Sequence, residues 1–219
     1  MRIEHALESI IPEYEKVNRV LSLNLIDSWW RECASHSRGA RRVLELGCGT
    51  GCLSRLITSE MHVCTDPSML MLLASRSQTQ GKKVYIQCIA ESLPFRDNTF
   101  DLVISSFAFR DFVNKRQALV EGFRVLRSGG RVVIAEIAKT NPVSAKVIYW
   151  YFKFALSILS RVRACRPENL SRWRILPETY RAFGYIKEYE DMMRDAGFKT
   201  VEHRAMSGGF ALLLTGVKP

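Results

Sequence analysis

A glycine-rich turn carries the clearest chemical signal in this sequence of 219 residues. The apolar stretch VLEL, residues 43–46, is followed by Gly47, Gly49 and Gly51, three glycines within five positions. Glycine allows left-handed backbone conformations, and it lets a ligand approach main-chain atoms that a Cβ would otherwise cover. We therefore expect a ligand to bind against the backbone of this turn.

An acidic residue at the end of the next apolar stretch suits the same site. Asp66 follows Glu45 by 21 residues, close to the interval of about 20 residues at which such an acid binds a ribose in dinucleotide-binding folds. A carboxylate can accept hydrogen bonds from both ribose hydroxyls. The turn reads ExGxGxG, which is neither the GxGxxG dinucleotide fingerprint nor a P-loop, because no Lys-Ser or Lys-Thr pair follows. The turn and Asp66 together predict a nucleoside site.

Apolar runs that alternate with helical patterns predict the elements that position this site. Strands are expected at 43–46, 61–65, 83–89, 100–107 and 131–137, with helices at 52–59, from Pro67 to 76, and at 114–126. Residues 128–130 (Ser-Gly-Gly) should form a turn, and 199–206 with 210–217 a closing antiparallel hairpin. Nearly continuous apolar strands are typical of a parallel sheet covered by helices on both faces. The sequence thus predicts an α/β fold.

Composition and charge narrow the setting of the protein. No run of about 18 apolar residues is present for a membrane span, and the acidic N-terminal segment does not resemble a secretion signal, so we expect a cytoplasmic protein. The net charge is +10, and residues 143–182 alone carry eight basic side chains against two acidic ones. Six cysteines show no CxxC spacing and no pairing with histidines, so buried thiols are expected and no metal site is.

The glycine turn resembles the cofactor site of class I S-adenosylmethionine-dependent methyltransferases, whose sheet is Rossmann-like and seven-stranded. The stretches that carry the resemblance are ELGCGTG and DPSML. The resemblance implies that the turn contacts the methionine portion of the cofactor and that Asp66 holds the ribose, with Pro67 and Met69 near the adenine. The cofactor-binding set that it implies is Tyr14, Glu45, Gly47, Cys48, Gly49, Thr50, Asp66, Pro67, Met69, Ile89, Ala90, Glu91 and Ser106.

Within that class, the chain is similar to the quinone C-methyltransferases of menaquinone and ubiquinone biosynthesis. The resemblance covers nearly the whole chain, from YEKVNRVLSLNLIDSWW through AESLPF and RVLRSGGRVVIAEIAK to SGGFALLLTGVKP. It implies a single methyltransferase domain over 1–219, with N-terminal cap helices at about 1–38 and a helical insertion on the substrate side at about 142–182. A lipophilic small-molecule substrate such as demethylmenaquinol follows from the same resemblance.

Three positions depart from the pattern of this family. Ile89 replaces an Asp that can accept a hydrogen bond from the adenine amino group, so adenine binding must depend on the backbone near Ala90, on Glu91 or on stacking. The GLRN stretch of the family reads AFRD here, which keeps Arg110 and introduces Asp111. A His-Arg pair of the N-terminal helix is replaced by residues 26–27, Ile-Asp.

Arg110 and Asp111 are the candidate catalytic residues. They follow the fourth predicted strand at its carboxyl end, on the side where a methyl acceptor is expected. Methylation of a quinol carbon requires that a ring hydroxyl lose its proton, so we expect Arg110 to stabilise the oxyanion and Asp111 to orient it or to accept the proton. A structural ion pair between the two residues is the alternative.

Other functions remain open at this point. Asp111 could attract a cationic amine, which favours N-methylation of a phospholipid headgroup or another small amine, and the lost Asp and His-Arg pair would suit a non-catalytic cofactor-binding partner of a methyltransferase complex. Nucleic acid is not expected, because no NPPY-like loop follows the fourth strand. The apolar segment 147–163 would serve as core, as a lid over substrate, or as peripheral contact with an anionic membrane at its inner face. A homodimer is equally compatible with the sequence.

Overall fold

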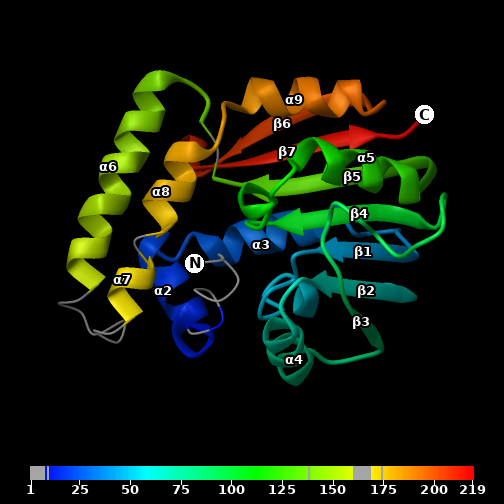
Figure 1. Ribbon diagram of the computed structural model, residues 1–219, viewed down its shortest axis with the longest axis horizontal. Helices are drawn as coiled ribbons and strands as arrows, with labels where there is room; N and C mark the ends of the chain where they lie inside the picture. The colour runs from blue at the N-terminus through cyan, green and yellow to red at the C-terminus, as the bar shows by residue number, and fades with distance from the viewer. Residues whose placement is uncertain (1–7, 9, 138, 160–168, 174) are drawn as a thin grey trace.

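A computed structural model describes residues 8, 10–137, 139–159, 169–173 and 175–219. Seven strands form one mixed sheet in the order β3-β2-β1-β4-β5-β7-β6 (Figure 1). The first five strands in this order are mutually parallel, and β7 is antiparallel to both of its neighbours, β5 and β6, which confirms the predicted fold and its closing hairpin. The strands are β1 (Arg42–Leu46), β2 (Met61–Asp66), β3 (Lys83–Gln87), β4 (Phe100–Ser106), β5 (Leu126–Glu136), β6 (Lys199–Met206) and β7 (Ala211–Val217).

Helices cover both faces of this sheet and enclose its two main apolar clusters. Helices α5 (Lys115–Val125) and α9 (Ile186–Asp195) pack on one face. Helix α3 (Ile26–Ser35) packs on the other face, and α4 (Met69–Gln78) lies against β2 and β3. Strand order reverses between β1 and β4, so the loops at the carboxyl ends of these strands border the crevice in which such sheets bind ligands.

A separate helical layer lies beyond the carboxyl ends of the parallel strands (Figure 1). It combines η1 (Ile11–Glu13) and α2 (Tyr14–Leu21) with α6 (Pro142–Leu159), α7 (Leu170–Trp173) and α8 (Ile175–Ala182). Val17 and Leu21 of α2 pack with Leu156 and Leu159 of α6 and with Trp173. Segments more than a hundred residues apart in the sequence thus form a common cover over the crevice.

Two predicted elements differ from the structure. The helix expected at 52–59 is only the short 3-10 helix η2 (Ser54–Leu56), because the Ser54 hydroxyl donates to the Glu45 carboxylate and the chain is extended again at Ile57. The turn expected at 128–130 lies inside β5, where Gly129 N–H donates to Lys218 and Gly130 accepts from it. Hydrogen bonds to distant segments decided both outcomes.

Candidate active site

The three glycines of the turn have different tasks. All have positive φ, +67° at Gly47, +52° at Gly49 and +86° at Gly51. A Cβ at Gly47 would stand 2.5 Å from the Ala108 Cβ, and one at Gly51 would stand 2.6 Å from the Ser75 hydroxyl, so both are required by protein packing. A Cβ at Gly49 would meet no atom within 4 Å. Gly49 is therefore the position at which open space lies beside the main chain.

Asp66 joins the end of β2 to this turn. Its Oδ2 accepts a hydrogen bond from the Gly49 N–H at 2.9 Å, and its Oδ1 accepts one from the Ser68 N–H at 2.9 Å. Each carboxylate oxygen has two lone pairs, so a carboxylate can accept hydrogen bonds from ribose hydroxyls as well as from backbone N–H groups. Asp66, which the sequence predicts to bind a ribose, therefore also connects the turn to the start of α4.

A cavity of about 560 Å³ opens beside the turn and brings almost all the predicted residues together. Met69 is the exception: it is 47% exposed and does not line the cavity, whereas Met71, buried in the next half-turn of α4, does. Ser68 caps α4 by accepting from the Met71 N–H, and this sets which methionine faces inward. The predicted residues that line the cavity are Tyr14, Glu45, Gly47, Cys48, Gly49, Thr50, Asp66, Pro67, Ile89, Ala90, Glu91, Ser106, Arg110 and Asp111.

The rim of the cavity provides polar groups at two further places. The buried Ser106 hydroxyl at the end of β4 has no hydrogen-bond partner among the described residues. Ile89 is exposed at the rim and offers no acceptor, while Glu91 accepts from the Asn114 N–H at 3.0 Å and retains lone pairs for another donor. Glu91 is thus the carboxylate that remains near the position where the family has an Asp.

Arg110 is held chiefly by Glu136 rather than by its neighbour Asp111. The Arg110 Nη1 donates to Glu136 Oε1 at 2.7 Å, whereas Arg110 Nε lies 3.8 Å from Asp111 Oδ1. Burial raises the pKa of Glu136, and the Arg110 guanidinium opposes that shift. The short ion pair of Arg110 is thus with Glu136. Asp111 lines the cavity and makes a longer contact with Arg110.

Burial also sets the protonation of two groups on the acceptor side. It raises the pKa of Asp111 above its usual range, although Arg110 and Lys115 oppose the shift. It raises the pKa of Tyr14 well above its usual range, with Arg110 opposing. Tyr14 therefore remains a neutral hydroxyl at physiological pH, and Asp111 is the group there that can gain and lose a proton.

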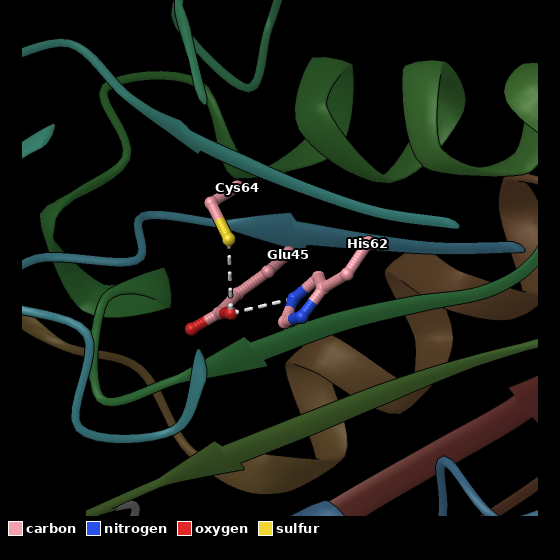
Figure 2. Close-up of side chains that lie close together, drawn as sticks. All are labelled: Glu45, His62 and Cys64. Atoms are coloured by element: carbon pink, nitrogen blue, oxygen red, sulfur yellow. Dashed lines mark hydrogen bonds and ion pairs between the residues drawn. The ribbon is translucent and has the colours of Figure 1, made fainter. Parts of the chain in front are cut away.

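A buried cluster of Glu45, His62 and Cys64 lies beneath the turn (Figure 2). His62 Nε2 is 2.9 Å from Glu45 Oε2, and Cys64 Sγ is 3.9 Å from the same oxygen. The three ligand atoms lie within 4.8 Å of one another, and the 2.9 Å His62–Glu45 contact has the length of a charge-assisted hydrogen bond. Burial would lower the pKa of His62, but hydrogen bonds to Cys64 and Glu45 raise it to about 9.

His62 lies beside Cys64 and Glu45, which corrects the expectation that no histidine pairs with a cysteine. The signal was present: His62 and Cys64 are two apart on one strand and so share a face, and Glu45 is in register with Cys64 on the neighbouring strand. Only the register, which the sequence does not show, brings the three together.

Comparison with known proteins assigns the family. The model of the ubiE/COQ5 methyltransferase family matches residues 1–218. The chain belongs to the ubiE/COQ5 methyltransferase family. The ubiquinone/menaquinone biosynthesis C-methyltransferase UbiE of Cronobacter sakazakii is 34% identical over 99% of this chain and 90% of the relative, and that of Klebsiella pneumoniae is 31% identical over the same shares.

Solved structures show the same fold at lower identity. An S-adenosylmethionine-dependent methyltransferase of Thermotoga maritima, described as a possible histamine N-methyltransferase, has a TM-score of 0.71 and 18% identity over 99% of this chain and all of that chain. The phosphoethanolamine N-methyltransferase 2 of Haemonchus contortus, solved with S-adenosylmethionine, has a TM-score of 0.58 and 15% identity over 82% of this chain and 49% of that chain.

The site of this ubiE/COQ5 family member fits S-adenosylmethionine on its own geometry. No side chain covers the main chain at Gly49, and the Asp66 carboxylate is hydrogen-bonded to its N–H. The Ser106 hydroxyl, in the wall of the same cavity, has no hydrogen-bond partner among the described residues. These groups suit, respectively, the amino acid end of the cofactor, its ribose and one further polar atom. Asp66 would hold the ribose, and the Gly49 region the methionine portion.

The raised pKa of His62 predicts how stability depends on pH. The unfolded imidazole titrates near 6.5, so the contacts of protonated His62 with Cys64 and Glu45 contribute fully below that pH and are lost as pH rises through the folded value of about 9. Up to about 3 kcal/mol of unfolding free energy should disappear over this interval. Urea unfolding at several pH values measures it.

The variant His62→Gln should lack this component, so the difference between wild type and variant should shrink as pH rises from 6.5 to above 9. Equal slopes for wild type and His62→Gln would show that His62 is not charged in the folded protein.

Proposed function

We propose that this methyltransferase transfers the methyl group of S-adenosylmethionine to a ring carbon of a lipophilic quinol such as demethylmenaquinol. The observation that carries the proposal is the continuity of the cavity, which extends from the glycine turn into an apolar chamber under the helical layer. Family membership and the names of the UbiE relatives agree with it. The chamber is lined by Leu21, Ile26, Trp29, Tyr151, Phe152, Leu176 and Phe210.

The cofactor, when bound, supplies an electrophilic methyl group on a sulfonium, so the protein acts mainly by placement and exclusion of water. The turn and Asp66 fix the position of the methyl group relative to β4. The apolar wall from α2, α6 and α8 excludes water and accommodates a prenyl-substituted ring. Ile26, where the family has a polar residue, is buried in this wall, and Asp27 faces away to pair with Arg19 at 3.0 Å.

Asp111 and Arg110 divide the acid–base work. As the carbon–carbon bond forms, the ring hydroxyl of the quinol loses its proton to the Asp111 carboxylate, whose raised pKa makes it a better base than an exposed aspartate. Arg110, kept charged by Glu136, stabilises the phenolate oxygen. The ring carbon then gives up its own proton to solvent as aromaticity is restored, and the phenolate oxygen takes back the proton held by Asp111, so the net reaction releases one proton. Tyr14 serves as a neutral hydrogen-bond donor at the same wall.

The direct test of this function is an anaerobic assay with purified protein, methyl-labelled S-adenosylmethionine and chemically reduced demethylmenaquinone. We expect by mass spectrometry a product heavier by about 14 Da for the methyl group plus the mass of the label, with the label on the ring carbon. Parallel reactions with phosphoethanolamine and with a quinone left oxidised should give none. Label on the amine alone, or no label on the quinol with cofactor binding intact, would refute quinol methylation.

The role of Asp111 predicts a pH profile. Because the base must be ionised, turnover should rise with pH through the raised pKa of Asp111, and Asp111→Asn should remove that limb and lower kcat by about a hundredfold or more. Cofactor affinity should stay within about threefold, because Asp111 lies on the acceptor side. Asp195→Asn, an exposed acid on α9, is the control. If Asp111→Asn keeps the wild-type kcat, Asp111 is not the base and its role is a structural contact with Arg110.

A further inference from the structure

The outward face of α6 exposes large apolar side chains. Val143, Val147, Trp150 and Phe154 are 72%, 59%, 65% and 65% exposed, respectively. Their spacing of four, three and four residues places them along one side of a helix. We call these four residues the outer stripe. Soluble proteins rarely leave such a contiguous apolar row open to water unless it contacts something.

The opposite side of α6 already accounts for the packing of the helix. Ile148 and Phe152 are buried against Tyr180, and Leu156 and Leu159 against α2. Tyr151 and Phe152 also line the cavity. The helix therefore separates the acceptor chamber from the outside, and the outer stripe is not part of the core. In Figure 1, α6 stands at the edge of the molecule, beyond α8 and away from the sheet.

Positive charge is interleaved with the outer stripe. Lys146 and Lys153 are exposed on the same side of α6, and residues 142–159 contain no Asp or Glu. The Lys153 ammonium lies 5.8 Å from the centroid of the Trp150 ring. Lysine stems can lie along an apolar surface while their charged ends reach upward to anionic groups. The sequence has further basic residues at 161, 163 and 166, which lie outside the residues that the structure describes.

We propose that the outer stripe of α6 docks onto an anionic phospholipid membrane surface. Trp150 and Phe154 enter the boundary between headgroups and acyl chains, and Lys146 and Lys153 bind lipid phosphates. The helix lies in the plane of the membrane: within the described part of the chain, no helix is long and apolar enough to cross one. This orientation places the wall of the acceptor chamber against the phase in which lipophilic molecules dissolve.

Charge argues for lipid rather than for a second copy of the chain. A two-fold contact between copies of α6 is antiparallel, and centred near Trp150 it sets Lys146 of one copy close to Lys153 of the other. Those like charges would repel each other, and α6 has no acidic side chain to compensate. An anionic membrane surface compensates both lysines at once.

Sedimentation with lipid vesicles tests the proposal on the full-length protein without cofactor, so its outcome is independent of the methyl acceptor. Vesicles of equal parts phosphatidylcholine and phosphatidylglycerol are compared with phosphatidylcholine alone at low salt. We expect binding to the anionic vesicles that weakens with salt. The double variant Trp150→Ser/Phe154→Ser should lower the partition coefficient at least about tenfold, and Lys146→Glu/Lys153→Glu should abolish the preference for anionic lipid.

Leu70→Ser/Leu73→Ser is the matched control, because these α4 leucines are 52% and 54% exposed elsewhere on the surface. It should bind vesicles as the wild type does, within about twofold. Thermal unfolding of each variant verifies that it folds. The proposal would be overturned by no binding of the wild type, by equal binding of the outer-stripe variant, or by a wild-type dimer that Trp150→Ser dissociates. Loss of binding in the α4 control would also overturn it, because a different surface would then carry the contact.

Discussion

The hydrogen bond from the Gly49 N–H to the Asp66 carboxylate is the constraint on which the site depends. It joins the turn after β1 to the end of β2 at 2.9 Å, and the other oxygen of Asp66 holds the first residues before α4. The parallel register of β1 and β2, with Leu46 opposite Thr65, brings the two segments together. One side chain therefore sets the shape of the turn and supplies the acceptor for a ribose.

The same device recurs along the edge of the sheet. Glu45 at the end of β1 binds Ser54 and His62, and Glu136 at the end of β5 binds Arg110 and the Ile137 N–H. Burying a carboxylate is costly unless donors satisfy it, so each acid orders the groups around it. Three buried acids near the carboxyl ends of β1, β2 and β5 thus hold the cofactor turn, the residues beneath it and the Arg110 guanidinium. The helical layer supplies the apolar part of the cavity wall.

Local signals in the sequence were enough to predict the glycine turn, Asp66, the strands and the closing hairpin, because each is encoded within a few residues. Features that depend on tertiary register were not predicted. Met71 rather than Met69 lines the cavity because the Ser68 cap sets the phase of α4, and Glu136 lies 26 residues from Arg110, the residue that it holds. The Glu45–His62–Cys64 cluster likewise requires the pairing of β1 with β2. The sequence does not show that Trp150 and Phe154 point outward, because this depends on which side of α6 packs against α2 and α8.

Calorimetric titration of S-adenosylmethionine into wild type and Asp66→Asn measures whether the Asp66 carboxylate both holds the turn and binds the cofactor. The amide is nearly isosteric, but it has a single acceptor oxygen and cannot satisfy Gly49, Ser68 and two ribose hydroxyls together. We expect saturable binding by the wild type and a dissociation constant at least about tenfold higher for the variant. Unchanged affinity in Asp66→Asn, or no binding by the wild type, would contradict it.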